Sequence, residues 1–286
     1  MSFPYPEVLS ELESQHIQVA SASRLSGGDI NDVFKLSTNR GDLCIKINSE
    51  SDFPGMLEGE MKGLEALTGK GIEVAAPIRF GQSEGTGFLL LHYIESGSKR
   101  PNFFEEFGTN LATLHQTTTD NFGFEGNNYI GSLNQINDWK SSWAEFYAEN
   151  RILFQVKLAY DAGKMSQSDL VQAERFCNQI ENLFPKETPS LIHGDLWSGN
   201  FMVNAEGAPI LIDPAVYFGH REMDIGMSTL FGGFDHDFYR TYNAVFPLEQ
   251  GWEDRIAFSQ LYPLLVHVNL FGGGYLSSVR QIIKMF

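Results

Sequence analysis

The sequence predicts an α+β protein built from two lobes, a β-rich lobe over residues 1–94 and a mainly helical lobe over residues 95–286. Alternating apolar and polar residues recur in the first part, whereas apolar residues at three- and four-residue steps recur in the second. Turn-forming residues fill the segment 96–102, SGSKRPN, which separates the two patterns. A chain of 286 residues is long enough for one large domain or two lobes with a real core.

In the N-terminal lobe the expected order is helix, glycine loop, hairpin, helix and two strands. Apolar residues at helical spacing predict a helix within residues 7–17, and the glycine-containing loop 26–31 follows. Residues 32–38 and 43–48 each alternate apolar and polar side chains on either side of the turn residues 39–42, which predicts a β-hairpin. The later elements expected in this lobe are a helix at 56–67 and strands at 77–82 and 87–94.

The C-terminal lobe is expected to begin with a helix over residues 103–115. A long loop rich in glycine and asparagine follows at 120–137, and a loop of this length inside a compact domain is commonly functional. Apolar stripes predict two long helices, 139–160 and 170–184. Short strands are expected between residues 190 and 213, and mainly helices from there to Phe286, with a break at the glycines 272–274.

Composition excludes several classes of protein. Twenty Lys and Arg against thirty-six Asp and Glu give a net charge of −16, which argues against a nucleic-acid partner, because such proteins neutralise phosphates with clustered basic residues. Cys44 and Cys177 are far apart and form no C-x-x-C pair, so neither a disulfide framework nor a thiolate zinc site is indicated. No signal peptide and no long apolar segment is recognisable, so we expect a cytoplasmic protein with no membrane association.

The strongest functional signal is the segment 193-HGDLWSGNFMVN-204, followed by 210-ILIDPA-215. It places Asp195 five residues before Asn200, with Asp213 at the end of the next apolar run. The catalytic loop of protein kinases, H-R-D-x-x-x-x-N, has the same spacing, and a later Asp binds magnesium. Asp195 suits the role of a carboxylate that orients the attacking hydroxyl and accepts its proton. Asn200 and Asp213 suit the role of oxygen ligands for Mg²⁺.

Each of these three residues alone has a simpler explanation. Asp195 and Asn200 are residue types that cap turns, and Asp213 precedes a proline as turn-forming aspartates commonly do. Their joint spacing, downstream of a glycine loop, a strand lysine and a helix glutamate in the order that kinases use, favours phosphoryl transfer instead.

The N-terminal half supplies those three preceding features. Lys46 lies between Ile45 and Ile47 in a strand, where kinases place the lysine that contacts the phosphates and pairs with a helix glutamate. Helix 56–67 contains three candidate glutamates. Glu60 is the partner we expect, because only Glu60 lies on the apolar side of this helix. A lysine that only keeps an edge strand soluble is the alternative. The preceding loop offers candidate phosphate-binding positions, which are Ser26, Gly27, Gly28 and Asn31. The alternative is that this loop is only the turn of a hairpin.

With these motifs in place, the sequence resembles the fructosamine (ketosamine) kinase family, a branch of the aminoglycoside-phosphotransferase and choline-kinase group. The resemblance extends over nearly the whole chain, and its narrower motifs are specific to this branch. The matching segments are 26-SGGDIN-31, 56-MLEGEMKGLEAL-67, 111-LATLH-115, 122-FGFEGNNYIGSLNQIN-137, 193-HGDLWSGN-200, 212-IDPAVYFGHREMDIGM-227 and 269-NLFGGGYL-276.

The resemblance implies a protein-kinase-like fold and transfer of phosphate from ATP, with Mg²⁺, to a sugar hydroxyl of ketosamines. These are the rearranged glycation adducts of amines such as lysine, and some family members initiate protein deglycation in this way. The adenine would be bound by the backbone around His92, Tyr93 and Ile94, with the His92 side chain turned away. Cys44, on the same strand face as Lys46, is expected against the adenine, or else is a small core residue.

Several residues are candidates for binding the acceptor. Trp197 is placed to stack on a sugar or to exclude water, or packs in the core. The charged residues Arg221, Glu222 and Asp224 are expected to bind an amine-bearing acceptor, or to form an ion pair that holds their loop. The candidate sugar contacts in the long loop are Tyr129, Asn134 and Asn137, and His115 is expected to be a core histidine.

Two other functions stay open at this point. The same chemistry serves an aminoglycoside, choline or another small alcohol as acceptor, although the segment 122–137 argues against that. A pseudokinase that binds nucleotide without turnover is a second alternative, which the filled catalytic positions argue against. The expected partner is a small ketosamine or glycated amine.

Overall fold

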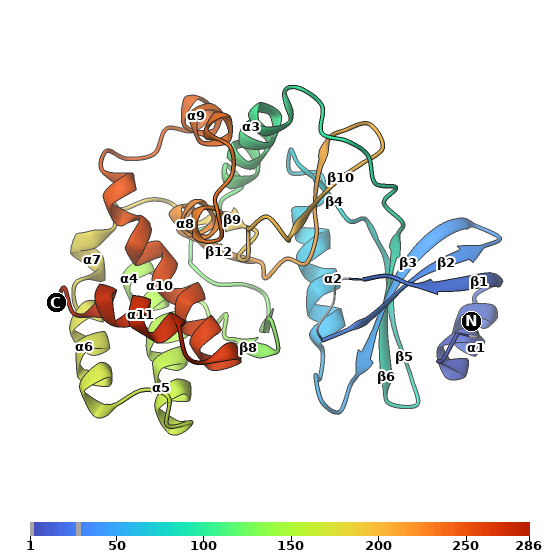
Figure 1. Ribbon diagram of the computed structural model, residues 1–286, viewed down its shortest axis with the longest axis horizontal. Coiled ribbons are helices and arrows are strands. Elements are labelled where there is room, and N and C mark those ends of the chain that lie inside the picture. The colour runs from blue at the N-terminus through green and yellow to red at the C-terminus, as the bar shows by residue number, and fades with distance from the viewer. Residues whose placement is uncertain (1–2, 27–29) are drawn as a thin grey trace.

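The N-terminal part of the protein is a twisted five-stranded antiparallel sheet with one helix on each side. The structure, a computed structural model, describes residues 3–26 and 30–286. Figure 1 shows the sheet at the right and the helices of the C-terminal part at the left. In sheet order the strands are β1 (Val19–Arg24), β2 (Asp32–Thr38), β3 (Gly41–Ser49), β6 (Thr86–His92) and β5 (Pro77–Ser83). The helices are α1 (Pro6–Ser14) and α2 (Met56–Leu67).

Strand β3 explains how the two faces of this sheet divide. Leu43, Ile45 and Ile47 point to one face and pack with α1 and with β2 and β6. The alternate residues point to the opposite face, because successive side chains on a strand alternate. Cys44 on this face packs with residues of α2, and Lys46 reaches a carboxylate on that helix. The face that carries Lys46 therefore looks toward the rest of the molecule.

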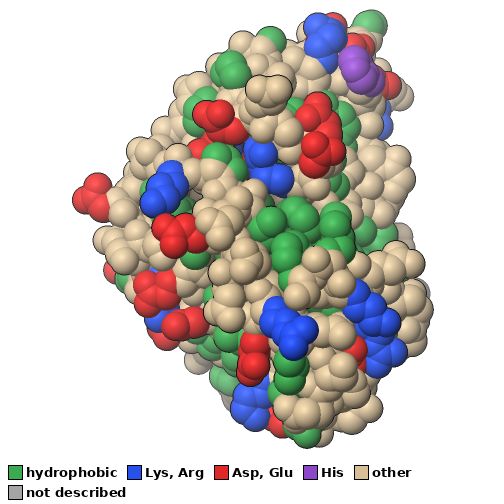
Figure 2. Space-filling model, turned by 90° about the vertical axis from the view of Figure 1, so that its left-hand side faces the viewer, with side chains coloured by type: hydrophobic (Ala, Val, Ile, Leu, Met, Phe, Trp, Pro, Cys, Tyr) green, Lys and Arg blue, Asp and Glu red, His purple; other side chains and the backbone are tan. Residues whose placement is uncertain are grey.

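The C-terminal part is mainly helical. Its helices are α3 (Phe103–His115), α4 (Trp143–Phe146), α5 (Phe154–Asp161), α6 (Gln167–Cys177), α7 (Ile180–Leu183), α8 (Glu222–Leu230), α9 (His236–Val245), α10 (Trp252–Phe271) and α11 (Tyr275–Ile283), with a π-helical segment at Tyr147–Leu153. The apolar sides of α4 to α7, α10 and α11 form one core, and α3 and α9 pack together in a second. Figure 2, which looks onto the side these helices form, shows acidic, basic and apolar side chains intermixed.

Three small sheets position the loops between these helices. Antiparallel β9 (Ser190–Ile192) and β12 (Tyr217–Gly219) form one, and the hairpin of β7 (Asn128–Ile130) and β8 (Leu133–Gln135) another. In the third, β10 (Phe201–Val203) pairs with β11 (Pro209–Leu211), which also pairs in parallel with β4 (Glu73–Val74). Since β4 precedes β5 in sequence, this sheet joins the N-terminal part of the chain to the C-terminal part.

The predicted α+β class is confirmed, with a sheet-rich N-terminal part and a helical C-terminal part. Helices α2 and α3 have the predicted bounds, and the hairpin of β2 and β3 is confirmed. The boundary predicted near residue 95 falls in a segment between β6 and α3 without helix or strand, and the division into two lobes stays a prediction. Among the described residues, no helix is both long and apolar enough to cross a membrane.

Several predicted bounds were wrong. The first long helix begins at Trp143, because Trp139 is exposed and packs against the Phe218 ring outside the helix. The second ends at Cys177 and is followed by the short α7. Strand β6 ends at His92, two residues early. The long loop contains the β7–β8 hairpin, and the strands β4 and β12 were not predicted.

Candidate active site

Two adjoining cavities lie where the sheet-rich part faces the helical part, and both are lined by Lys46 and Asp213. We call the cavity of about 290 Å³ the nucleotide chamber and that of about 210 Å³ the acceptor chamber. The nucleotide chamber is lined mainly by apolar side chains and by residues 92–94. The acceptor chamber carries the polar groups. Its predicted site residues are Asn31, Lys46, Glu60, Tyr129, Asp195, Trp197, Asn200 and Asp213.

Lys46 connects the two parts of the molecule. Its Nζ donates to Oε1 of Glu60 on α2 at 2.6 Å and to Oδ1 of Asp213 at the end of β11. The Lys46 and Glu60 side chains are each 11% exposed, so this ion pair is shielded from solvent. The pair predicted from the strand lysine and the helix glutamate is therefore present, and of the three candidate glutamates it is Glu60 that forms it.

The electrostatics of this cluster keep Lys46 charged. Burial alone would lower the pKa of Lys46, but the carboxylates of Asp213 and Glu60 outweigh it and raise the pKa above its usual value. The pKa of Glu60 is raised, because burial and the nearby Asp213 carboxylate together exceed the effect of Lys46. A permanently protonated lysine at the junction of the chambers is suited to binding an anion.

The loop of residues 193–200, which we call the catalytic loop, is held by hydrogen bonds to the carboxylate of Asp224. The backbone N–H groups of His193 and Gly194 donate to its two carboxylate oxygens at 2.7 and 2.9 Å, and Nε2 of His115 lies 3.2 Å from the same carboxylate. Burial would raise the pKa of Asp224, but the hydrogen bond from His115 and the nearby donors hold it below its usual range. Asp224 is thus a buried carboxylate that fixes the loop backbone.

Gly194 lets this loop approach the strand segment that carries Asp213. Its φ of 84° lies in the left-handed region, and a Cβ here would stand 2.0 Å from the carbonyl oxygen of Ala215. His193 completes the turn, because its Nε2 donates to the Ile212 carbonyl while its Nδ1 accepts from the Asp195 N–H. Burial lowers the pKa of His193, which favours this neutral form.

Asp195 and Asn200 face each other across the loop. The Asn200 amide donates from Nδ2 to the carbonyl oxygen and to Oδ2 of Asp195, at 2.8 Å each. Burial raises the pKa of Asp195 to about 7, against the lowering effect of the Asn200 hydrogen bond and with further rises from Asp213 and Asp224. A carboxylate with a pKa near neutral is suited to accept a proton from a substrate hydroxyl.

Asn200 and Asp213 present the oxygen atoms that a magnesium ion prefers. Oδ1 of Asn200 and Oδ2 of Asp213 accept no hydrogen bond from any residue that the structure describes, and the Asp213 side chain is 43% exposed toward the chambers. Asp213 also has a left-handed φ of 54°, a conformation that costs about 1–2 kcal/mol and is found preferentially at functional sites. Two protein oxygens fit Mg²⁺, which is typically bound by one or two side chains together with phosphates.

The nucleotide chamber contains the predicted adenine contacts. Cys44, His92, Tyr93, Ile94 and Ser26 all line it. Burial raises the pKa of the Cys44 thiol to about 11, so it is a neutral wall of the cavity. The His92 side chain is exposed, as expected for a hinge residue that contributes only backbone. The predicted phosphate contacts Gly27 and Gly28 lie outside the described residues.

The predicted acceptor contacts separate into two groups. Tyr129 and Trp197 line the acceptor chamber, where Trp197 makes an edge contact with Phe231. Asn134 is exposed opposite Tyr129 in the hairpin, and Asn137 is buried with its amide bound to Asn128. Neither Asn134 nor Asn137 lines the chamber, so these two predictions were wrong.

The charged group at residues 221–224 was also predicted wrongly as an acceptor site. Arg221 is buried in an ion pair with Glu187 at 2.6 Å, and Glu222 in one with Arg255 at 2.6 Å. Asp224 is fully buried beneath the catalytic loop. All three side chains are satisfied by protein partners and none lines either chamber. The alternative, an ion pair of Arg221 with Glu222 or Asp224, is not formed either, because the ion-pair partners of Arg221 and Glu222 come from outside the group.

A buried polar network that the sequence did not reveal supports the wall of the acceptor chamber. Its members are Asn128, Gln135, Asn137, Arg151 and Tyr262. Arg151 donates from Nη2 to Asn137, Asn137 donates to Asn128, and Gln135 donates to Asn128 and accepts from Tyr262. Nδ2 of Asn128 binds the Val216 carbonyl and Nε2 of Gln135 the Ala215 carbonyl. The hairpin is therefore tied to the backbone just beyond Asp213. No local pattern in the sequence marks this network, because residues far apart in the chain, such as Gln135 and Tyr262, form it.

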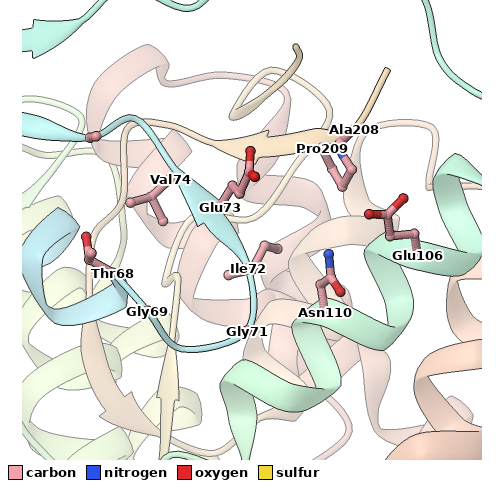
Figure 3. Close-up of a pocket in the computed structure, with 11 residues that line it drawn as sticks. Thr68, Gly69, Gly71, Ile72, Glu73, Val74, Glu106, Asn110, Ala208 and Pro209 are labelled. Carbon is pink, nitrogen blue, oxygen red and sulfur yellow. The ribbon is translucent and has the colours of Figure 1, made fainter. Parts of the chain in front are cut away.

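A third cavity, of about 620 Å³, lies behind the nucleotide chamber and holds none of the predicted residues. Figure 3 shows it between β4, α3 and the start of β11, with Glu73, Glu106 and Asn110 around it. Ala76 lines this cavity whereas Ala75 lines the nucleotide chamber, so the short connection between β4 and β5 lies between the two.

Comparisons with known proteins identify the family of this chain. The sequence matches the fructosamine kinase family over residues 3–286. A protein of Arabidopsis thaliana named protein-ribulosamine 3-kinase, chloroplastic, is 39% identical over 95% of this chain and 84% of its own length. A protein of Enterococcus faecium named probable ketoamine kinase is 37% identical over 91% of this chain and 93% of its own.

Solved structures give the same result. A structure from Thermobifida fusca named for a fructosamine-3-kinase has a TM-score of 0.86 at 32% identity and covers 97% of each chain. An aminoglycoside phosphotransferase, APH(4)-Ia, in complex with ADP and hygromycin B has a TM-score of 0.64 at 13% identity and covers 98% of each chain, a likeness that shows the kinase-like fold alone. The resemblance seen in the sequence is confirmed, and the chain belongs to the fructosamine kinase family.

Proposed function

We propose that this protein transfers the γ-phosphoryl group of ATP to a sugar hydroxyl of a ketosamine. The observation that carries the proposal is the position of Asp195, whose carboxyl has a pKa of about 7, beside the Lys46 and Asp213 pair where the two chambers meet. Membership of the fructosamine kinase family supports a ketosamine as acceptor, since relatives are named as ketoamine and ribulosamine kinases.

ATP fits the pair of chambers. Its adenine would lie against Cys44 and receive hydrogen bonds from the backbone of residues 92–94, and its phosphates would extend past Lys46. Asn200 and Asp213 would hold Mg²⁺. When bound, that ion neutralises the charge on the phosphates. Ser26 and Asn31, which line the chambers, would contact the triphosphate.

The chain's own residues then do mainly positioning. The acceptor hydroxyl would hydrogen-bond to Asp195, which accepts its proton as the oxygen attacks the γ-phosphorus, and ADP leaves on the opposite side. Asn200 orients Asp195 through the two bonds described above. Lys46 offsets the charge of the phosphates, and Trp197 and Tyr129 border the space left for the sugar. Correct placement alone supplies a large part of the rate enhancement in such reactions.

The acceptor chamber suits a cationic acceptor. The carboxyl groups of Glu60, Asp195 and Asp213 face one ammonium, of Lys46, although Asp195, with a pKa of about 7, is only partly ionised at neutral pH. The amine nitrogen of a ketosamine is a cation of the required kind. An aminoglycoside or choline would share that charge, so the acceptor must be established by turnover. The finer proposals, a role in deglycation and a cytoplasmic location, rest on the family resemblance alone.

The test is release of ADP from Mg-ATP in the presence of fructosyl-lysine, ribulosyl-lysine, an aminoglycoside, choline or free fructose. Turnover is expected with the ketosamines and not with the other acceptors. D195N is the inactive control, and it should still bind ATP. Turnover with only an aminoglycoside or choline would show that the ketosamine is not the acceptor. Binding of Mg-ATP with no turnover on any acceptor would favour a pseudokinase.

A further inference from the structure

Asn48 is a buried polar residue beside the active site to which the mechanism above gives no role. It lies on β3 two residues after Lys46, so both side chains point to the same face of the sheet. The residue is only 8% exposed and lies between Met56, the first residue of α2, and Asn31, which lines the acceptor chamber. A buried amide lowers the stability of the protein unless it is hydrogen-bonded, so the contacts of Asn48 indicate why a polar residue is found here.

The contacts of Asn48 fix the orientation of Asn31. Nδ2 of Asn48 donates to Oδ1 of Asn31 at 3.1 Å and lies 3.4 Å from the Met56 sulfur. Oδ1 of Asn48 is buried and has no partner among the residues that the structure describes. Since Oδ1 of Asn31 accepts from Asn48, the end of the Asn31 amide that remains available to a ligand is the donor, Nδ2.

We propose that Asn31 donates a hydrogen bond from Nδ2 to the γ-phosphoryl group, and that Asn48 is the positioning residue that sets this orientation. The proposal rests on the proposed function, because it requires the phosphoryl group to pass from the nucleotide chamber into the acceptor chamber. Phosphoryl oxygens only accept hydrogen bonds, so an Asn31 turned the other way would present a repelling carbonyl oxygen. The two ends of an amide have nearly the same shape, and therefore a hydrogen-bond partner, not packing, must select between them.

The substitution N48D tests the orientation with almost no change in shape. An ionised carboxylate cannot donate to Oδ1 of Asn31, so the Asn31 amide should rotate, give Nδ2 to the new carboxylate and turn Oδ1 toward the ligand. N48L removes the partner without adding charge and leaves Asn31 free to adopt either orientation. The two variants should therefore differ in their effect on the γ-phosphoryl group.

The measurement is calorimetric affinity for Mg-AMP-PNP and for Mg-ADP, with thermal unfolding of each variant recorded alongside. We expect N48D to lose about tenfold or more in affinity for AMP-PNP and N48L about threefold, losses of about 1.4 and 0.7 kcal/mol. Affinity for ADP, which has no γ-phosphoryl group, should change less than about twofold. A purely structural role would lower both affinities together or lower only the unfolding temperature.

Two controls isolate the contribution of Asn31. In an N31A background, N48D should lower the affinity for Mg-AMP-PNP only slightly, through its added charge. N178D adds the same charge at an exposed site on the end of α6. Equal losses for AMP-PNP and ADP, an unchanged N48D, or the full N48D loss without Asn31 would each overturn the proposal. Turnover of ketosamines by the unmodified protein is measured in parallel, so failure of the proposed function is seen separately.

Discussion

At the scale of single residues, the raised pKa of Asp195 bears on stability as well as on its proposed catalytic role. Its pKa of about 7 in the folded protein lies well above the value of about 3.9 expected in the unfolded chain. The folded state therefore retains a proton that the unfolded state has lost between about pH 4 and pH 7, and the stability of the protein falls as the pH rises through that window. The same shift gives the carboxylate the basicity needed to accept a proton near neutral pH.

We therefore expect D195N to be less active and more stable. Turnover should fall by about 10²–10⁴, while the free energy of unfolding at pH 8 rises by about 1–2 kcal/mol, because the partly buried, ionised carboxyl is removed. At pH 4 the two proteins should be equally stable. Urea unfolding at both pH values, without ligands, measures this. A variant less stable than the parent at pH 8 would show that the Asn200 hydrogen bonds outweigh the effect of burial.

The pH dependence of the reaction gives a second check on Asp195. If its carboxylate accepts the proton, kcat/KM for the acceptor should decrease on the acid side of about pH 7, since kcat/KM reports groups of the free enzyme. A profile flat from pH 5.5 to pH 8.5 would remove proton acceptance from the role of Asp195 and leave it only the orientation of the hydroxyl.

The sequence predicted single residues well where chemistry demands a fixed spacing. Lys46, Glu60, Asp195, Asn200 and Asp213 come from separate segments and lie around one chamber. Arg221 and Glu222 were misassigned because charged residues look the same in a sequence whether they face a ligand or a buried partner. Their partners, Glu187 and Arg255, are more than thirty residues away, and only the folded chain brings them together.

At the scale of elements, the catalytic loop and α8 act as one unit through Asp224. This carboxylate accepts from two backbone N–H groups of the loop and contacts His115 of α3. D224A leaves these buried donors without an acceptor, so we expect a loss of about 3 kcal/mol or more in unfolding free energy. Turnover measured well below the unfolding temperature should also fall.

The matched control for D224A is D161A. Asp161 is an exposed partner of Lys157 on α5, and its removal should change stability by no more than about 0.5 kcal/mol. Equal stability of D224A and D161A would mean that the loop holds its conformation without the carboxylate. Loss of turnover without loss of stability in D224A would assign it a role in the chemistry itself.

The C-terminal helix α11 is held to α6 by a different carboxylate. Asp169 belongs to the capping box of α6 and accepts two hydrogen bonds from Arg280, both at 2.8 Å. These bonds hold the pKa of Asp169 well below its usual range. The ionised form is thus favoured in the folded state, and its contribution is present above about pH 4 and lost as the pH falls further.

D169N should therefore destabilise the protein by about 1 kcal/mol at pH 7, a value reduced by the exposure of Arg280. The difference from the parent should shrink below pH 4, where the parent carboxyl also becomes protonated. Urea unfolding from pH 7 to pH 3 measures this. A difference that stayed constant over the whole range would assign the effect to the Ser166 cap and not to the ion pair.

Elements were predictable in proportion to their length and periodicity. Helices α2 and α3 carry apolar residues at regular steps and a clear start and end, and their bounds were predicted. Strands β4 and β12 have two and three residues, too few to show a period, and exist because a distant segment pairs with them. The long helix begins late because Trp139 packs on Phe218 of β12, a contact that no local pattern contains.

At the scale of the whole molecule, the sheet that contains β4 and β11 joins the two parts of the chain directly behind the nucleotide chamber. Residues 73–74 come from the N-terminal part, and β10 and β11 from the segment that carries Asn200 and Asp213. Ala75 donates from its N–H to the Leu211 carbonyl and lines the chamber. This one small sheet therefore fixes the wall of the nucleotide chamber relative to the segment that carries the proposed metal ligands Asn200 and Asp213.

The excess of negative charge also acts at the scale of the whole molecule. The chain carries a net charge of −16, and Figure 2 shows acidic and basic side chains interspersed on the side formed by the C-terminal helices, so no single patch there accounts for the excess. The acceptor chamber has the same sign, with three carboxyl groups and one ammonium. Such a field attracts cations and is screened by salt over about 10 Å at 0.1 M.

Salt should therefore weaken binding of a cationic acceptor and leave the chemical step unchanged. Raising NaCl from about 50 mM to about 300 mM shortens the screening length by more than half, so we expect KM for fructosyl-lysine to rise about two- to fivefold at constant kcat. An acceptor with an acylated, uncharged amine provides the control, and its KM should change little. Initial rates at saturating Mg-ATP give both constants. An equal rise in KM for the charged and uncharged acceptors would show that salt acts on the protein or on nucleotide binding, and that the acidic chamber does not select the acceptor by its charge.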